Sequence, residues 1–367
     1  MSKKLVFLCG ARDFHAMDWY RSAKELLNDA DISIVTDLIA GEGFEKIIKP
    51  DDKLYKLLIL DYFLFRNQSA LGDKWRNILK LLVLPIQVFL LWLFSKKNPS
   101  AIYHAHSMYY LVLARLAGVN YIGTPQGSDI LVKPLRSKFY YSFAKFGLLG
   151  AKHITVDSKN MQAGVNKICS RDAMLIQNGI DIKFLKEITN NFSNNDERNG
   201  LLSIRGFTEL YQIHKILDAR NNSTFGKSPI TFIYPFHEDI YKAQCSKHLQ
   251  PLDKDLGRVP RDVMYNLMLS AELIISIPES DSSPRSVYES VFCGAAVAIE
   301  YNSYYELLPE CMKKRIIIVK TADKDWFDKA IISASEILKN KYTPSVEALK
   351  LFDQRESFKI LEKLHLE

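Results

Sequence analysis

The feature that most constrains the fold of this chain is a repeated alternation of short apolar runs and helical segments. In the first half, apolar runs with strand character occupy 4–10, 32–38, 101–106, 120–129, 152–158 and 173–179. The Asn-rich stretch 189–200 interrupts the pattern, which resumes at 201–206, 230–235, 272–278, 295–300 and 315–320. Strands that alternate with helices form parallel sheets covered by helices on both faces. We therefore expect an α/β protein with two doubly wound, Rossmann-like parallel-sheet domains.

The chain length and the polar break set the expected domain boundaries. With 367 residues, the chain exceeds what one hydrophobic core usually supports. We expect a first domain at 1–185, a linker at 186–199 and a second domain at 200–347. The helical C-terminal stretch, about 348–367, is expected to pack back on the first domain. Because such sheets bind ligands at the carboxyl ends of their strands, two facing sheets would place the site in an interdomain cleft.

Composition and cysteine usage argue against several classes of protein. The five cysteines lack paired spacing, which indicates reduced thiols in a cytosol and disfavours a disulfide framework or a zinc site. The net charge of +7 is mild and no basic run alternates with aromatic residues, so we expect no nucleic-acid partner. The apolar part of the N-terminus is too short for a signal peptide, and we expect a cytoplasmic protein.

The most apolar stretch is 75–97, which has two interpretations. Its core, Leu81 to Phe94, has 14 residues, fewer than the roughly 20 that a membrane-spanning helix needs. The core is flanked by aromatic and basic residues of the kind found at membrane interfaces, Trp75, Arg76, Lys80, Trp92, Lys96 and Lys97. A buried core helix is the other interpretation. With the basic and aromatic stretch 133–152, the first interpretation makes an anionic membrane surface a partner and the protein peripheral on the inner face of the plasma membrane.

Two common phosphate-binding motifs are missing. The first loop, CGARDFHAMD, has one glycine where a dinucleotide fingerprint needs three, and no Walker sequence occurs. The segment 276–299 instead combines a strand end, a Ser/Pro loop, a helix, a glycine and an apolar strand. A helix N-terminus offers backbone N–H groups to an anion, and a carboxylate two turns later accepts hydrogen bonds from vicinal hydroxyls. Asp281 and Glu289 bracket the loop and the first turns of the helix in this segment, which therefore predicts a site for phosphate and sugar.

This segment, in which SSPRSVYESVFCGAAVAI follows Asp281, resembles the donor-site motif of retaining glycosyltransferase family 4, which has the GT-B fold. The motifs IYHAH and GTPQGSDI resemble the family's acceptor-domain pattern, and LIQNGIDIKFL resembles its turn before the interdomain linker. LLSIRGFTELY resembles the first strand of the nucleotide domain, and LGRVPRDVMYNLMLSAELIISIPE resembles the base-contacting loop with the following helix. The resemblance spans nearly the whole chain in register.

The resemblance implies a role for each matching residue. Glu289 would hold the ribose hydroxyls, Asp281 the transferred sugar and Arg205 the diphosphate, while His106 would lie against the sugar. These four are the expected catalytic residues. The expected donor-binding residues are Gly10, Asn178, Arg205, Tyr211, Arg258, Val259, Asp281, Ser283, Pro284, Arg285, Ser286 and Glu289. The expected acceptor-binding residues are Arg12, Asp13, His15, Asp18 and Gln126.

The chain departs from the family pattern at several positions. The first carboxylate is Asp281 instead of the usual Glu, and Leu210 replaces the usual Lys five residues after the arginine. The first loop keeps one glycine, and its polar residues are open to two roles, loop capping and acceptor contact. His104 and His106 alternate on a strand, and we expect them to point to opposite faces, with His106 the functional one.

The function implied by the resemblance is transfer of a sugar from a nucleotide-sugar, with a UDP-sugar favoured, to a hydroxyl of a glycan or lipid-linked glycan. Retention of the anomeric configuration is implied, with no metal and no cofactor, in synthesis of a bacterial cell-surface polysaccharide such as lipopolysaccharide. Two alternatives remain: a GT-B nucleotide-sugar epimerase, and a non-catalytic module that binds a glycan or a membrane.

Overall fold

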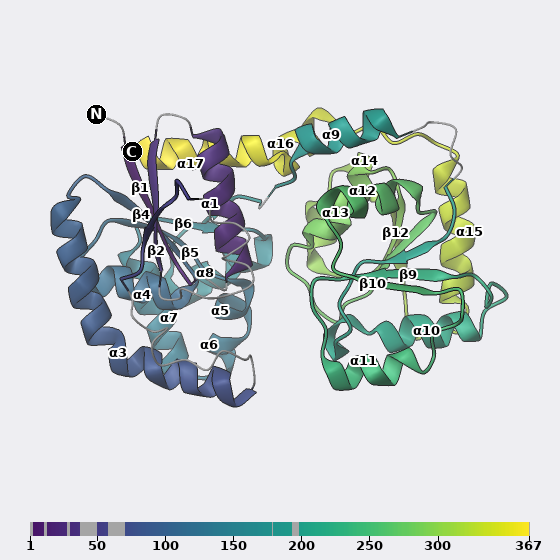
Figure 1. Ribbon diagram of the computed structural model, residues 1–367, viewed down its shortest axis with the longest axis horizontal. Helices are drawn as coiled ribbons and strands as arrows, with labels where there is room; N and C mark the ends of the chain where they lie inside the picture. Colours follow the sequence, from purple (N-terminus) through teal and green to yellow (C-terminus); the bar gives the residue numbers. More distant parts are fainter. Residues whose placement is uncertain are drawn as a thin grey trace. The chain divides into compact units, whose positions relative to one another are not determined.

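The computed structural model describes residues 3–10, 13–27, 30–36, 50–57, 70–177, 179–192 and 198–366. The chain forms two compact units (Figure 1). One contains residues 1–178 and 355–367, and the other contains residues 179–354. Each unit is built around one parallel sheet.

The sheet of the first unit has the strand order β3-β2-β1-β4-β5-β6-β7, with every paired strand parallel to its neighbour. Its strands are β1 Lys3–Cys9, β2 Ala30–Thr36, β3 Lys53–Tyr55, β4 Ile102–His106, β5 Tyr121–Thr124, β6 His153–Val156 and β7 Met174–Leu175. The order reverses between β1 and β4. In doubly wound sheets, ligands bind outside the carboxyl ends of the strands at such a reversal.

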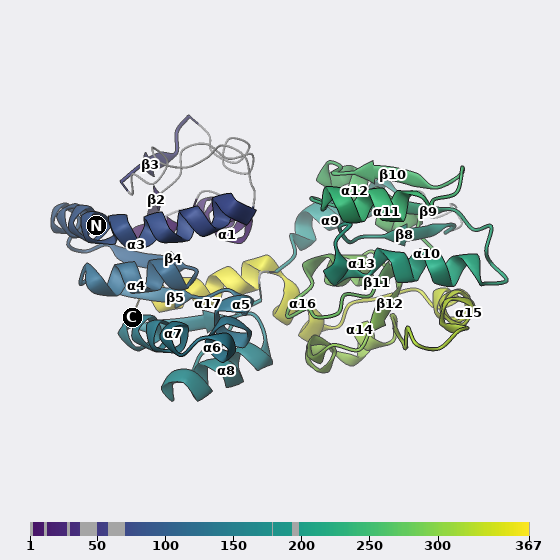
Figure 2. The ribbon, with the colours of Figure 1, turned by 90° about the horizontal axis from the view of Figure 1, so that it is seen from below.

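Helices cover both faces of this sheet. They are α1 Phe14–Leu26, α3 Ala70–Lys97, α4 Met108–Leu116, α5 Gly127–Leu131, α6 Lys133–Arg136, α7 Lys138–Gly150, α8 Lys159–Cys169 and α17 Gln354–Leu366. Alternate residues of β1 enter opposite cores: Val6 and Leu8 pack with α3, α4, α7 and α8, whereas Leu5 and Phe7 pack with α1 and α17. Figures 1 and 2 show α3, α4 and α7 side by side in one layer.

The second unit repeats the same plan with the order β10-β9-β8-β11-β12-β13. Its strands are β8 Leu201–Ser203, β9 Ile230–Ile233, β10 Lys254–Gly257, β11 Leu273–Ser276, β12 Ala296–Glu300 and β13 Ile316–Val319. Its helices are α9 Ile182–Asn191, α10 Ile213–Asn221, α11 Asp239–Ser246, α12 Arg261–Ser270, α13 Arg285–Phe292, α14 Glu310–Lys313, α15 Trp326–Leu338 and α16 Val346–Phe352. One core joins the sheet to α9, α12, α13, α14 and α16, and the other joins it to α10, α11 and α15. The sheet order reverses between β8 and β11.

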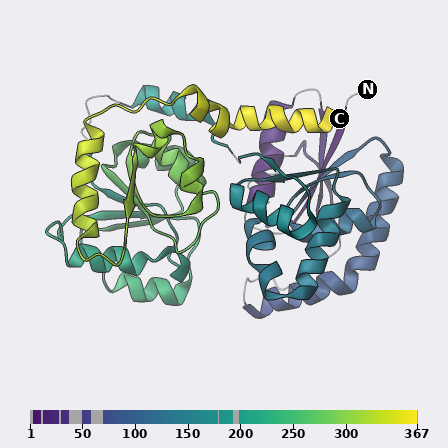
Figure 3. The same ribbon diagram turned by 180° about the vertical axis from the view of Figure 1, so that it is seen from behind.

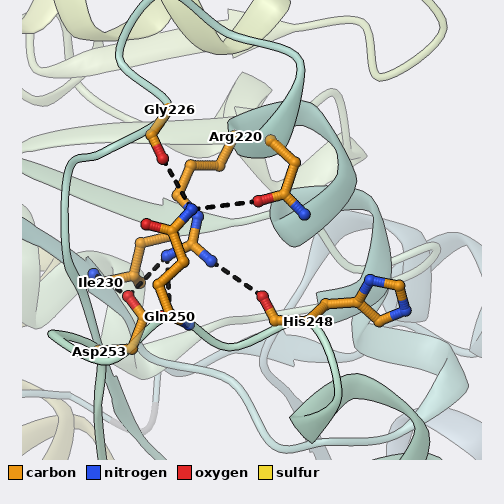
Figure 4. Close-up of polar contacts among 7 residues, drawn as sticks. Arg220, Gly226, Ile230, His248, Gln250 and Asp253 are labelled. Carbon is orange, nitrogen blue, oxygen red and sulfur yellow. Dashed lines mark hydrogen bonds and ion pairs between the residues drawn. The ribbon is translucent and has the colours of Figure 1, made fainter.

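A buried ion pair ties three segments of the second unit together (Figure 4). Arg220, at the end of α10, donates to both carboxylate oxygens of Asp253 over 2.6 and 2.7 Å, and it also donates to the carbonyl of His248. The same carboxylate accepts from the backbone N–H of Ile230 at 2.8 Å and of Gln250 at 2.7 Å. The pair therefore fixes the segment that leads into β10.

The unit boundaries differ from the expected domain boundaries. Residues 182–191 form α9, whose Ile182 and Leu185 pack in a core of the second unit, so the polar stretch expected as a linker is helical as far as Asn191. The expected C-terminal helix is two helices. The first, α16, packs on the second unit, whereas α17 (the yellow helix ending at the C-terminus in Figure 3) packs on the first unit through Phe358 and Leu361.

Candidate functional site

The first part of the site lies at the carboxyl ends of β8 and β11, where the order of the second sheet reverses. Arg205 follows β8, and Asp281 follows β11. The Arg205 Nη2 lies 2.7 Å from Asp281 Oδ2, and the Arg205 Nε donates to Ser276 Oγ over 2.7 Å. Tyr211 packs beneath the guanidinium, with its ring centroid 5.4 Å from Cζ. Because the two charged side chains are only 11% and 18% exposed, they form a largely buried pair at the sheet reversal.

The loop after β12 supports this ion pair. The backbone N–H of Asp281 donates to Asn302 Oδ1 over 3.0 Å. Tyr304 is buried, and within the described residues its hydroxyl has no hydrogen-bond partner. Burial raises the pKa of Tyr304, and the nearby Arg205 and Asp281 act on this pKa in opposite directions. The sequence predictions did not include Asn302 and Tyr304, whose signal is the polar and aromatic run directly after an apolar strand.

The second part of the site is the carboxylate of Glu289 on α13. Glu289 is 4% exposed. Its Oε1 accepts from the Tyr265 hydroxyl at 2.9 Å and from the Arg285 Nε at 3.2 Å, and the Arg261 Nη2 lies 3.7 Å away. Among the described residues, the structure places no donor on Oε2. One carboxylate oxygen is therefore held by the protein, and the other remains as a hydrogen-bond acceptor.

Arg261 and Tyr265 were missed by the sequence predictions, although both stand on α12 one turn apart. The Arg261 Nε donates to the Tyr265 hydroxyl over 3.2 Å. Burial raises the pKa of Tyr265, and the Glu289 carboxylate raises it further. Burial would lower the pKa of Arg261, but Tyr265 and Glu289 outweigh this effect, and the pKa is raised. Both side chains thus hold the Glu289 carboxylate in place.

The loop Ser283–Pro284 leads into α13, which begins at Arg285 and carries Ser286 in its first turn. Pro284 is the N-cap, and no side chain caps the helix start. The first N–H groups of a helix have no partner within the helix, so this end attracts anions. Apolar residues on the other side of α13, such as Val287 and Val291, anchor it in the core. The helix therefore presents backbone donors at one end and Glu289 one turn later.

Arg258 and Val259 lie in the loop between β10 and α12. Arg258 is exposed, whereas Val259 is partly buried against the apolar core of the unit. The loop is followed by Arg261, the first residue of α12, whose Nη2 lies 3.7 Å from Glu289 Oε1. The replacement residue Leu210 is 43% exposed, and its carbonyl accepts from the backbone N–H of Glu279 over 2.8 Å.

The expected acceptor residues belong to the first unit. Asp13 caps α1 by accepting from the backbone N–H of Ala16 at 3.1 Å, and its other carboxylate oxygen accepts from Gln126 Nε2 at 2.8 Å. Loop capping is therefore one role of Asp13, and the structure joins it directly to Gln126. Gly10 precedes this loop. His15 and Asp18 lie in α1, whereas Arg12 and Asn178 lie outside the described residues.

The expectation that His104 and His106 point to opposite faces is wrong. Side chains two residues apart on a strand share a face, and the two imidazole centroids are 4.3 Å apart. Both rings lie against Phe7 and Trp19. His104 is bound to Thr124 Oγ1 over 2.7 Å. His106 stands at the tip of β4, beside the reversal of the first sheet.

Over the residues that the structure describes, no group of three or more His, Cys, Asp or Glu side chains is arranged to hold a metal ion. The five cysteines have free thiols, and four of them are buried.

No protein-family model matches the sequence, and no curated protein matches it. HepE from Anabaena, solved in complex with UDP and glucose, is 15% identical and matches with a TM-score of 0.69 over 100% of both chains. Sucrose-phosphate synthase from Thermosynechococcus elongatus is 12% identical and has a TM-score of 0.72 over 99% of this chain and 98% of that chain.

The chain has the GT-B fold. The prediction of two Rossmann-like parallel-sheet domains is confirmed. A third similar structure, UDP-GlcNAc 2-epimerase from Neisseria meningitidis bound to UDP-GlcNAc, is 12% identical and has a TM-score of 0.61 over 99% of this chain and 100% of that chain.

Proposed function

We propose that this protein is a glycosyltransferase that moves a sugar from a nucleotide-sugar, with a UDP-sugar favoured, to a hydroxyl of a glycan or lipid-linked glycan. One observation carries the proposal. Arg205 and Asp281 are paired at the reversal of the second sheet, and the described contacts hold Glu289 through Oε1. Arg205 offers a positive charge, and Asp281 and Glu289 each offer a carboxylate that can accept hydrogen bonds from hydroxyl groups. All three lie in the unit that resembles a nucleotide-binding domain.

The contacts suggest how the donor is held. Glu289 Oε2 accepts from the ribose hydroxyls, while Oε1 stays with its protein partners. Among the described residues, the Nε and Nη2 of Arg205 bind Ser276 and Asp281, and we assign its Nη1 donors to the diphosphate. The N-terminus of α13 adds backbone donors to the same anion. Arg205 and the helix thus provide the positive charge that a Lys at the position of Leu210 would otherwise supply.

The reaction follows from where charge develops. The bond between the anomeric carbon and the diphosphate breaks, and the acceptor oxygen forms a new bond to that carbon. Preorganised donors stabilise the leaving diphosphate without a metal ion. The departing phosphate oxygen takes the proton of the acceptor hydroxyl, and the new bond forms with retention. Asp281 contacts the transferred sugar, and the roles expected for His106, Asp13 and Gln126 of the first unit stay predictions. We place this reaction in the synthesis of a cell-surface polysaccharide.

Donor binding is tested by thermal shift and calorimetry with UDP, GDP and ADP. We expect UDP to stabilise the protein and Glu289→Gln to weaken UDP binding roughly 10- to 100-fold, because one charged hydrogen bond is lost. Glu336→Gln is the matched control, since Glu336 is 66% exposed on the same unit. Absence of stabilisation by every nucleotide would contradict the donor site.

An epimerase is the second candidate, favoured by the similarity to UDP-GlcNAc 2-epimerase. The two enzymes differ in what they need. An epimerase converts a UDP-sugar into its epimer without an acceptor, whereas a transferase releases UDP in proportion to the acceptor glycosylated. Nuclear magnetic resonance of a UDP-sugar incubated alone separates them. A non-catalytic module predicts that Glu289→Ala leaves glycan binding unchanged and that UDP is never released.

A further inference from the structure

The longest helix of the described chain, α3, carries many large apolar residues on its exposed side. Exposed side chains at i, i+4 and i+3 spacing form one stripe, which we call the outer face of α3: Ile78, Leu82, Ile86, Phe89, Trp92 and Leu93. Leu82 is 67% exposed and Phe89 is 56% exposed. A surface helix of a soluble domain normally turns this kind of stripe toward the core. Exposed apolar patches of this extent mark sites of interaction.

The opposite side of α3 is already packed. Leu91 and Phe94 belong to the core of the first unit, which α4 shares. Gln87, the polar residue of the stretch 81–94, is fully buried, and its Oε1 accepts from the hydroxyl of Tyr109 on α4 at 2.5 Å. The same hydroxyl lies 2.9 Å from the Lys80 carbonyl. The helix therefore buries Gln87 together with part of its apolar side chains and leaves the apolar outer face exposed.

Charge and aromatic residues indicate what covers this face. No charged residue occurs from 81 to 95, and Lys96 and Lys97 follow, both exposed. The Lys96 Nζ lies 5.5 Å from the ring centroid of Trp92. Tryptophan and lysine at the border of an apolar surface are typical of helices that lie in a membrane interface.

A second segment adds the same chemistry to the same helical layer. Leu135 is 75% exposed on α6, and Phe139 is 70% exposed at the start of α7. Lys133, Arg136 and Lys138 are exposed beside them. Because α4 packs against both α3 and α7, and α6 packs against α7, these helices are neighbours in the first unit (Figure 2). Basic residues of this kind attract anionic lipids.

The part Ile78–Lys97 is a 20-residue segment long and apolar enough to cross a membrane, so the expectation that the stretch is too short to span is corrected. Its side contacts favour a different placement. In the most apolar part of this segment, 22% of the residues are buried, and the buried side of the helix is hydrogen-bonded to α4 through Gln87. A spanning helix would have to release Leu91 and the Gln87–Tyr109 bond. A helix that keeps them presents only its outer face.

We propose that the outer face of α3, with the exposed basic and apolar residues of α6 and α7, docks on an anionic lipid bilayer with α3 lying in the plane of the interface. The other interpretation of the sequence, a buried core helix, does not account for the exposed outer face of α3. This surface places the protein at the membrane as a peripheral protein. It is independent of the proposed nucleotide chemistry in the second unit.

The test is co-sedimentation of the full chain with vesicles of phosphatidylcholine alone or with about 30 mol% phosphatidylglycerol, a fraction chosen to mimic an anionic leaflet. We expect binding to the anionic vesicles. Leu82→Ser/Phe89→Ser should weaken it at least about 20-fold, because two large apolar side chains no longer enter the interface. Lys96→Gln/Lys97→Gln should weaken binding to the anionic vesicles roughly 25-fold, about fivefold for each lysine, and leave binding to neutral vesicles unchanged.

The matched control is Ile240→Ser/Leu252→Ser, since these residues of the second unit are 79% and 70% exposed. Its vesicle binding should equal that of the unchanged protein, and circular dichroism should show all variants folded. Equal loss in the control and in the α3 variant would overturn the proposal, as would absence of vesicle binding by the unchanged protein. Resistance to carbonate extraction from cell membranes would overturn it in favour of a spanning helix. A lipid-independent dimer lost in the α3 variant would assign the face to a second copy instead.

Discussion

The buried pair of Arg220 and Asp253 gives a stability prediction whose size follows from its contacts (Figure 4). The two side chains are 0% and 1% exposed. Replacing Arg220 with Met leaves a carboxylate buried without its counter-charge, and breaking a buried pair in this way costs about 3–5 kcal/mol. For a unit of the size of residues 179–354, about 2–4 °C is lost per kcal/mol. We expect the melting temperature of the second unit to fall by roughly 6–20 °C.

The contacts also predict an order among variants. Asp253 accepts from two backbone N–H groups in addition to Arg220, so Asp253→Ala leaves more donors without partners. It should therefore destabilise more than Arg220→Met. Glu336→Gln is the control, because its ion pair with Lys339 is 66% exposed on each side and should change stability by less than about 1 kcal/mol.

The assay is thermal and urea unfolding followed by circular dichroism and by calorimetry. The cycle of Arg220→Met, Asp253→Leu and the double variant then measures the coupling between the two side chains. A loss below about 1 kcal/mol for Arg220→Met would refute the reasoning, since it would mean that water reaches and solvates the carboxylate. So would an effect equal to that of Glu336→Gln.

Three further predictions concern individual groups. Asp281→Asn should leave UDP affinity within about threefold but lower the rate of sugar transfer roughly 10- to 100-fold, as measured by calorimetry and UDP release, because the charged contact to the sugar is lost. A thiol reagent at pH 8 should label Cys311 first, since the other four thiols are buried and burial raises the pKa of Cys293; mass mapping of the labelled peptide checks this. Burial would raise the pKa of Asp255, but bonds from Lys242 and Tyr234 outweigh it and hold the pKa below its ordinary 3.8, so the carboxylate stabilises the fold above about pH 4 and this contribution is lost as the pH falls through the lowered value. Urea midpoints of Asp255→Asn should therefore show a shallower decline below pH 4 than those of the unchanged protein.

Part of the site followed from the sequence because parallel strands align their carboxyl ends. Arg205 and Asp281 each come shortly after an apolar run, so their meeting at one edge of the sheet follows from strand polarity. Arg261 and Tyr265 carry no such signal. Their contact with Glu289 exists only because α12 packs beside α13, and helix neighbours are not encoded in local periodicity.

Other errors have equally physical origins. The expectation of opposite faces for the two histidines fails because a period of two places residues 104 and 106 on one face. The Asn-rich composition of 189–200 gives no sign that α9 continues to Asn191. The buried apolar residues that mark this helix, Ile182 and Leu185, both precede that stretch. The stretch 75–97 was undecidable from sequence, since an apolar helix has the same composition whether its stripe faces a core or a bilayer.

The pairing of Arg205 with Asp281 also has a consequence for how binding competence arises during folding. The two residues are 76 positions apart in the chain, and they meet only where β8 and β11 lie side by side. A fragment that ends before β11 therefore has no half-formed site, however well its helices form. Competence to hold a ligand appears in one step, with the closing of the central strand pair, and a bound nucleotide would act as a reporter that this non-local pairing is complete.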